Sequence, residues 1–445
     1  MSLSEKSFKD NVISVSNPIW DIGQKPFYDN SIVSSNFIEY FDTNTGSLNA
    51  RTQFDLTLTD LSTYVQLANS YLEIRLTILQ ATGAQTGQIF AADVNIAIQN
   101  SVLSAFQRLE LRLDSKVISH LDDPGHMQQV ISMSKWSRAY EETNGAAMGV
   151  RIDRSPFQAD TATNEGFKVR QALTDNGRQA VYFIPLSEIW SYISQNPIII
   201  RGSRFSMHLF KENNLNRVFF RANGVEDARI NWNKISLWMY TVVPEPKLSI
   251  KLEKKLISSD KVLQLWSDIQ IQRSTNLAPT TSVEFQFTIA SGLPQGIYIT
   301  FRLLDDDTTQ QSNSAAWKNV DVSELEVRFN SRVFPNEAIQ TDFSTGDTHN
   351  TGRAFKFYLQ SRDTPLDTES GSLVDLAQWE DNNRLFYIPL NQKDEPGNRN
   401  ELFILTVKAR INPQPASDFE IVILTLNRTK AIVQFLQSKV NTLRI

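Results

Sequence analysis

The sequence predicts a mainly β protein that consists of two similar antiparallel β domains in tandem. Short runs rich in Val, Ile, Phe and Tyr recur along the chain, and clusters of Gly, Pro, Asn, Asp and Ser separate them. Several runs of the first half return in the second half in the same order. The 445 residues also exceed the length at which a single hydrophobic core usually stops growing.

The composition is that of a folded protein without thiol chemistry. Hydrophobic residues make up 41% of the chain and charged residues 21%, which excludes the polar composition of a disordered chain. A formal net charge of −5, with no run of five like charges, argues against a dedicated nucleic-acid or anionic-lipid binder. The absence of Cys excludes disulfides, thiolate metal sites and cysteine nucleophiles.

No targeting segment is predicted at the N-terminus. The first 20 residues are polar and lack the apolar core of a signal peptide, and no apolar run approaches the ~18 residues of a membrane span. We therefore expect a soluble protein that is synthesised in the cytoplasm.

The best strand candidates alternate between apolar and polar residues. Leu109, Leu111 and Leu113 share one face of such a run, as a half-buried strand requires. Other strand-like runs cover residues 53–60, 71–79, 282–290 and 402–411. Helices are expected only at 123–142 and 186–194, on connections. Long polar stretches at 81–93, 143–177, 305–314, 341–352 and 361–372 are interpreted as insertions between strands.

The boundary between the halves is expected near residues 245–260. Pro244 and Pro246 cannot donate to a sheet ladder, so they end the preceding strand. The predicted division is an N-terminal arm at 1–50, a first β domain at 51–246, a linker at 247–260, a second β domain at 261–435 and a C-terminal tail at 436–445.

Two nine-residue stretches, 216 positions apart, are nearly the same. LELRLDSKV at 109–117 and LEVRFNSRV at 325–333 differ only by substitutions that keep the physical role of each residue. The Asp-Ser and Asn-Ser pairs are typical of a turn between two strands, so the same hairpin is predicted twice. Its apolar residues should therefore lie in two equivalent cores: Leu109, Leu111, Leu113, Leu325, Val327 and Phe329.

Three further echoes keep the same order along the chain. VYFIPLS at 181–187 returns as LFYIPLN at 385–391, YLEIRL at 71–76 as YITFRL at 298–303, and RFSMHLFK at 204–211 resembles LFILTVKA at 402–409. We infer two tandem copies of one β sandwich. About eight strand segments per copy, with long connections and no Cys pair, favour two eight-stranded jelly rolls over immunoglobulin sandwiches.

The search for chemistry nominates no catalytic, cofactor-binding or metal-binding residue. His120 and His126 are six residues apart across a Pro-Gly turn and could meet at a metal, but solvent-exposed loop histidines are favoured, and His208 and His349 have no His partner nearby in sequence. Asp305–Asp307 could collect a divalent cation, although a charged loop is the preferred interpretation. Residues 346–352 (GDTHNTG) are interpreted as a flexible tip.

Enzyme signatures are missing as well. The chain has no G-x-S-x-G elbow, no P-loop and no G-x-G-x-x-G, and a glycosidase pair cannot be chosen among 49 carboxylates. We therefore expect a protein that is not an enzyme and needs no cofactor. Residues 428–445 contain four basic residues and no acid; a last strand and a packed tail are preferred there over a basic tail that contacts genome or lipid headgroups.

The first half resembles a known family of viral proteins. The stretches concerned are YVQLANSYLEIRLTI, NIAIQNSVLSAFQRLELRLDSKVIS, YFIPLSEIW, IIIRGSRFSMHLFKEN and ARINWNKISLWMYTVVPEP, which span residues 64–246. In content and order they resemble the double jelly-roll major capsid proteins of Polinton-like viruses, virophages and adintovirus-type elements. From residue 260 onward the resemblance depends on the internal repeat.

The resemblance implies a mechanical role in a virion. Three copies of a two-domain chain would form a homotrimer, a pseudo-hexameric capsomer that tiles an icosahedral capsid beside neighbouring capsomers, penton proteins and minor capsid proteins. The arm and the tail would lie near the base of the shell, where the tail could weakly contact the genome or an inner membrane. A minor capsid or spike protein and a tandem β-sandwich carbohydrate-binding protein are the alternatives.

Overall fold

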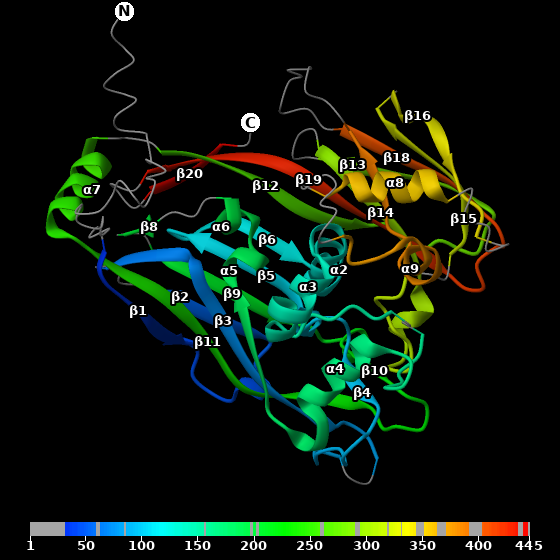
Figure 1. The fold of residues 1–445 in the computed structure, drawn as a ribbon, viewed down its shortest axis with the longest axis horizontal. Helices are drawn as coiled ribbons and strands as arrows, with labels where there is room; N and C mark the ends of the chain where they lie inside the picture. Colours follow the sequence, from blue (N-terminus) through cyan, green and yellow to red (C-terminus); the bar gives the residue numbers. More distant parts are fainter. Residues whose placement is uncertain are drawn as a thin grey trace, which may run out of the picture.

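Sixteen of the strands in the described part of the chain form two sets of eight with the same arrangement. The two sets lie side by side (Figure 1). The structure is a computed structural model. It describes residues 32–58, 63–83, 86–154, 157–195, 199–201, 204–258, 262–289, 294–317, 320–330, 332–343, 351–362, 371–390, 403–434 and 439–443.

The first jelly roll consists of two antiparallel four-stranded sheets. One has the order β1 (Ile32–Phe41), β11 (Ala228–Pro244), β3 (Tyr64–Gln80) and β7 (Ala180–Pro185), with the short β8 (Ile199–Ile200) beside β3. The other has the order β2 (Gln53–Leu58), β9 (Phe205–Lys211), β5 (Phe106–Leu113) and β6 (Lys116–Asp122). A separate two-stranded sheet joins β4 (Ile96–Ile98) to β10 (Phe219–Arg221).

The second jelly roll repeats both sheets strand for strand. One sheet has the order β12 (Val262–Arg273), β19 (Phe419–Gln434), β14 (Pro294–Leu303) and β17 (Phe386–Pro389), with β20 (Lys439–Leu443) beside β19. The other has the order β13 (Ser282–Ile289), β18 (Phe403–Ile411), β15 (Val322–Phe329) and β16 (Arg332–Gln340). The prediction of two tandem eight-stranded jelly rolls is confirmed.

The two predicted hairpins have the same turn conformation and the same side-chain hydrogen bond at the turn. β5 turns into β6 through Asp114 and β15 turns into β16 through Asn330, and both turn residues have positive φ, at 49° and 53°. The Asp114 side chain accepts the amide of Arg204 at 2.8 Å, and the Asn330 side chain accepts the amide of Ile404 at 3.1 Å. Asp and Asn tolerate this left-handed conformation, which is why the turn uses them twice.

The apolar residues of both hairpins lie in the core, as predicted. Leu109, Leu111, Leu113, Leu325, Val327 and Phe329 are all buried. On the opposite face, Arg112 pairs with Glu110 at 2.6 Å and Arg328 with Glu326 at 2.5 Å. Each hairpin therefore presents the same apolar side to its sandwich and carries the same ion pair on the opposite side.

The remaining echoes also lie on equivalent strands, but two of them change register by two residues. Met207 pairs with Leu111 and Val407 pairs with Val327, so RFSMHLFK corresponds to the second half at an offset of 200 (407 minus 207), whereas matching it to LFILTVKA requires 198.

The other change of register concerns YLEIRL. Ile184 pairs with Leu72, and Ile388, 204 residues later, pairs with Ile297. Leu72 therefore corresponds to Ile297, an offset of 225 (297 minus 72), whereas matching YLEIRL to YITFRL requires 227. Because the side-chain period of a strand is two, the two-residue difference keeps every side chain on the same face.

Helices lie on the connections between strands. Those of the first jelly roll are α2 (Pro124–Lys135), α3 (Arg138–Tyr140), α4 (Glu165–Thr174), α5 (Leu186–Ile189) and α6 (Ser191–Gln195). The others are α7 (Pro246–Ser258), α8 (Gly352–Gln360) and α9 (Leu376–Asn382). Short 3-10 or π turns occur at Leu48–Ala50, Val102–Ala105, Glu141–Gly145, Asp175–Gly177, Leu215–Arg217 and Leu304–Asp307.

Helix α4 lies in a stretch that we expected to be a loop. The Asn164 side chain accepts the amide of Phe167 and so caps the first turn, and Phe167 and Arg170 are buried. Some polar residues of α4 thus face inward, so the sequence of this stretch lacks the apolar periodicity by which a helix is recognised. The helices expected at 123–142 and 186–194 are present as α2, α3, α5 and α6.

Three segments outside the two expected β domains have regular secondary structure. Residues 32–41, assigned to the arm, form β1, which pairs along its length with β11. Residues 247–258, assigned to the linker, belong to the helix α7, and residues 439–443 of the expected tail form β20 on β19. Edge strands bury few side chains, so their apolar pattern is weak in the sequence.

One contiguous hydrophobic core runs through both jelly rolls. Its largest fully buried residues include Trp190 of the first jelly roll and Trp379 of the second. In the part of the chain that the structure describes, we find no helix long and apolar enough to span a membrane.

Candidate assembly surfaces

The two jelly rolls are joined by a connection of the second that lies against the first. This connection, residues 304–317, links β14 to β15. The Gln310 amide group donates to the Ala228 carbonyl at 3.0 Å, and its oxygen accepts the Ala228 amide at 2.7 Å. The Ser314 hydroxyl donates to the Gln99 side chain at 2.5 Å. These buried side chains satisfy backbone groups of the other jelly roll, so the contact is specific as well as apolar.

A buried ion pair of the first jelly roll contacts this connection. Arg170 of α4 binds both carboxylate oxygens of Asp153, at 2.8 and 2.9 Å, and both side chains are almost fully buried. Asn313 of the connection donates to the same carboxylate at 3.0 Å. Burial of this charge pair is tolerated because each carboxylate oxygen has a hydrogen-bond partner.

An ionic cluster lies where the strand β12 meets the end of β6. The Asp123 carboxylate, directly after β6, lies 2.5 Å from a guanidinium nitrogen of Arg217 in the first jelly roll. The same carboxylate oxygen also pairs with Arg273 of the second jelly roll. Arg273 pairs in addition with Glu420 of β19. Asp123 is therefore a single carboxylate shared by guanidinium groups of both jelly rolls.

The second half of this ionic cluster surrounds Asp307. Its carboxylate binds Arg302 at 2.5 Å and lies 3.6 Å from Arg217. Burial alone would raise the pKa of Asp307, but the Arg302 and Arg217 guanidinium groups hold that pKa below its usual value. Of the three aspartates in this acidic run, whose sequence favours a charged loop, Asp307 thus serves as an ion-pair partner between the jelly rolls.

His126 is buried inside the same cluster, with 7% of its surface exposed. Its Nε2 donates to the Ser314 carbonyl at 3.0 Å, and its Nδ1 lies 3.0 Å from an Arg273 nitrogen that can donate to it. Burial lowers the pKa of His126 to about 3, and Arg302 and Arg217 add to the shift. The Ser314 carbonyl and the Asp307 carboxylate oppose the shift. The Asp123 carboxylate lies 2.7 Å from Nδ1 and is shared with two arginines.

These positions correct the interpretation of the histidines. His126 is not a solvent-exposed loop residue, because the second jelly roll covers it. His120 lies on β6 with Asp122 at 3.9 Å, and His208 lies on β9 opposite Glu110. Within the described ranges no three His, Asp or Glu side chains are grouped so that they could hold a metal ion. His349 and residues 346–350 of the expected flexible tip lie outside the described residues.

Comparison with known proteins gives matches of structure but not of sequence. No family model matches the chain, and no significant match to a curated protein is found. A chain of the Sputnik virophage structure is similar at a TM-score of 0.63 and 12% identity, over 98% of this chain and 93% of that chain. The mavirus major capsid protein has a TM-score of 0.59 and 11% identity, over 95% and 94% of the two chains. The Faustovirus major capsid protein has a TM-score of 0.53 and 8% identity, over 91% and 92%.

The chain has the double jelly-roll fold. The similarity covers both jelly rolls together. The shared architecture therefore includes the side-by-side placement of the two jelly rolls as well as the fold of each one. In this chain the ionic cluster and residues 304–317 add polar contacts to the apolar core that the two jelly rolls share.

The double jelly roll has an exposed aromatic surface on its first half. The outer side of the sheet β1-β11-β3-β7 carries one aromatic residue after another, and we call this surface the aromatic face: Phe37, Phe41, Tyr71, Phe183, Trp238 and Tyr240. Ring centroids lie 5.1 Å apart for Phe37 and Tyr240 and 5.5 Å apart for Tyr71 and Phe183. Contiguous exposed apolar surface of this kind is typical of an interaction site.

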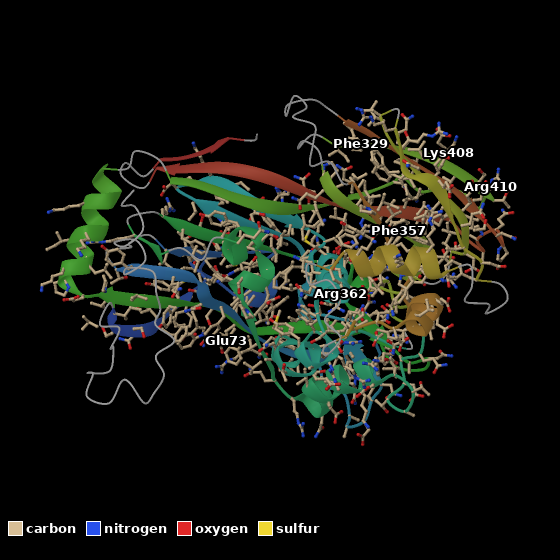
Figure 2. The ribbon with its side chains drawn as sticks, turned by 45° about the horizontal axis from the view of Figure 1, so that its top comes forward. Glu73, Phe329, Phe357, Arg362, Lys408 and Arg410 are labelled. Carbon is tan, nitrogen blue, oxygen red and sulfur yellow. The ribbon has the colours of Figure 1, made fainter. Side chains whose placement is uncertain are left out.

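A buried carboxylate orders the aromatic face. Glu73, which Figure 2 labels, accepts the Trp238 indole N–H at 2.5 Å, pairs with Arg75, and lies 3.3 Å from the Lys234 ammonium. Burial would raise the pKa of Glu73, but these donors lower that pKa below its usual value. Lys234 also pairs with Glu39 of the edge strand β1, so the charges tie three strands together.

Proposed function

We propose that this protein is the major capsid protein of a virus, a structural subunit without catalytic activity. The observation that supports the proposal most strongly is the pair of jelly rolls packed side by side in one chain, similar over nearly its whole length to virophage and giant-virus major capsid proteins. The protein would be made in the host cytoplasm and would reside in the virion.

The geometry suits a shell-forming block. Three copies of a double jelly roll present six similar sandwiches around one axis, so a homotrimer has a pseudo-hexameric outline that can tile an icosahedral capsid. The connection at 304–317 and the ionic cluster fix the angle between two neighbouring sandwiches inside each chain. The partners of such a trimer are neighbouring capsomers, penton proteins and minor capsid proteins.

Two alternatives make different predictions. A penton built from a single jelly roll would not need the duplication, so a minor capsid or spike role is less well supported. The aromatic face favours a second candidate, a carbohydrate-binding protein, because sugars stack on exposed aromatic rings. Glycan-array binding in the micromolar range by a monomeric protein would support that candidate.

Light scattering and electron microscopy of the purified full chain test the proposal. We expect a particle of about 152 kDa, three times 50.6 kDa, and threefold blocks with a six-sided outline. A monomer at micromolar concentration that forms no shells at any salt concentration would rule out a major capsid protein.

A further inference from the structure

We propose that a cavity between the two jelly rolls is a binding site for a small organic anion that carries a flat aromatic ring. The cavity has a volume of about 420 Å³, which falls in the range of small-molecule sites. The inference goes beyond the proposed function, because it depends on the double jelly roll of one chain and not on its assembly.

Both jelly rolls line this cavity. Residues of α2, α3, α5 and α6 form most of its wall, and the second jelly roll contributes Ile269 of β12 and Arg362, two residues after α8 (Figure 2 labels Arg362). The Tyr358 hydroxyl of α8 donates to the Met133 carbonyl of α2 at 2.5 Å. This buried hydrogen bond holds the segment that carries Arg362 against the helix on the other side, so the site is formed before a ligand arrives.

The charges of the wall favour an anion. Lys135, the last residue of α2, and Arg362 contribute two positive charges, and Glu188 of α5 contributes one negative charge. The Glu188 carboxylate accepts the Tyr140 hydroxyl at 2.7 Å, and burial together with this carboxylate raises the pKa of Tyr140 above its usual value. Tyr140 is therefore neutral, and the described wall has a net charge of +1 (two minus one), which attracts a negatively charged ligand.

The Arg362 guanidinium is only partly satisfied by the wall. Its Nη1 donates to the Gly371 carbonyl, and its buried Nε has no hydrogen-bond partner among the described residues. A guanidinium group has five N–H donors and binds the oxygens of a carboxylate or phosphate in pairs. An anion in the cavity would therefore gain charge-assisted hydrogen bonds from a side chain that the protein itself leaves short of acceptors.

The apolar part of the wall favours a flat ring. Trp136 and Tyr140 both line the cavity, with ring centroids 5.0 Å apart and planes inclined at 59°. Ile131, Ile189 and Ile269 add aliphatic surface beside them. Aromatic rings pack well against such surfaces, in offset or edge-to-face arrangements with Trp and Tyr. An aromatic carboxylate or phosphate combines this ring with the charge that Lys135 and Arg362 attract.

Serine hydroxyls make a purely apolar ligand a poor match. The Ser194 hydroxyl donates to the Ser191 carbonyl at 3.2 Å, and the Ser137 hydroxyl accepts the Tyr140 amide at 3.2 Å. Their remaining hydrogen-bonding capacity would be lost against a hydrocarbon chain, which costs free energy. Four serines line the cavity: Ser137, Ser187, Ser191 and Ser194.

Two probes of nearly equal shape separate the effect of charge from that of the ring. In isothermal titration calorimetry with the full-length protein, 2-naphthoate should bind about tenfold or more tightly than the neutral 2-naphthamide. Inorganic phosphate, which has charge but no ring, should also bind more weakly than 2-naphthoate. Equal affinity for 2-naphthoate and 2-naphthamide, or no binding of 2-naphthoate at millimolar concentration, would overturn the inference.

Variants of the wall test the site itself. Lys135→Gln and Arg362→Gln should each weaken 2-naphthoate binding about tenfold. Ser191→Trp, which fills the cavity without removal of a charge, should abolish binding, and circular dichroism should show an unchanged β fold. The matched control is Lys356→Gln, which changes an exposed lysine of α8 outside the cavity and should bind as the wild type does. Equal weakening in Lys356→Gln, or full binding by Ser191→Trp, would overturn the inference.

Photolabelling locates the ligand independently of affinity. An azido derivative of 2-naphthoate should label residues 131–140 and 187–194 in the full-length protein, as found by mass spectrometry, and excess 2-naphthoate should suppress the label. Label found only in other parts of the chain would overturn the inference. Trimers and shells that form without any bound ligand would leave the capsid proposal standing whatever the labelling shows, so the two proposals fail separately.

Discussion

Removal of the charge at Asp123 should destabilise the protein far more than removal of the neighbouring charge at Asp122. Asp123→Asn keeps the size of the side chain and is compatible with the left-handed φ of 50° at this position. It removes the negative charge and replaces one acceptor oxygen by an amide donor. The carboxylate pairs with Arg217 and Arg273, whose side chains are about one quarter exposed or less. Loss of one partner costs about 3–5 kcal/mol for buried pairs and about 0–1 kcal/mol for surface pairs.

The expected cost of Asp123→Asn lies between these limits, at about 2 kcal/mol. Arg273 retains Glu420 and Arg217 retains Asp307, which limits the loss. Asp122→Asn is the matched control: its side chain is half exposed, its nearest guanidinium nitrogen lies 3.6 Å away, and less than about 0.5 kcal/mol is expected.

Urea denaturation at pH 7 and one fixed protein concentration measures both variants, since assembly also contributes to the apparent stability. The midpoint of the first cooperative transition should fall for Asp123→Asn and stay near the wild-type value for Asp122→Asn. Equal midpoints for the two variants would refute the reasoning, because Asp123 would then have no role in holding the jelly rolls together.

Three further predictions concern the duplication and the buried histidine. Leu109→Ala and Leu325→Ala should each cost about 3 kcal/mol in urea denaturation, and a difference above about 2 kcal/mol would speak against equivalent core positions. Asp114→Ala and Asn330→Ala should each lower the free energy of unfolding by about 1–2 kcal/mol in the same assay, because each variant loses a hydrogen bond and places Ala at a positive φ. Unchanged stability of either variant would contradict the equivalence of the two turns. The free energy of unfolding of the wild-type protein should fall as pH drops below 6.5, because His126 binds a proton in the unfolded chain but, with a pKa of about 3, stays neutral in the folded protein. Thermal unfolding should show a loss of about 2 kcal/mol by pH 5. His126→Gln should remove this pH-dependent loss.

The positions that the sequence predicted best are those where local pattern and tertiary role agree. The alternation at 109–113 and the Asp-Ser and Asn-Ser turns describe a hairpin whose register depends on nearby residues alone, and both hairpins are confirmed. The two-residue change of register between YLEIRL and YITFRL was not predictable, because strands with the same period match equally well two residues apart.

The sites that were missed depend on contacts between distant segments. His126 stands near the start of the helix predicted at 123–142 and was interpreted as solvent-exposed, yet Ser314, 188 residues away, covers it. Asp307 belongs to an acidic run that is typical of a solvated loop, and only the fold brings Arg302 and Arg217 to it. β1 was assigned to an arm because an edge strand with exposed side chains has no strong apolar period.

By itself the sequence determined the fold class, the duplication and the core faces of the repeated strands, since these depend on hydrophobic period and turn chemistry that each segment carries locally. Only the tertiary structure decided which equivalent sheet face is covered and which is open, and which charges meet at the junction of the jelly rolls. Burial of Tyr298 and exposure of Phe37 follow from the packing of one sandwich on another, and that packing is a property of the whole chain.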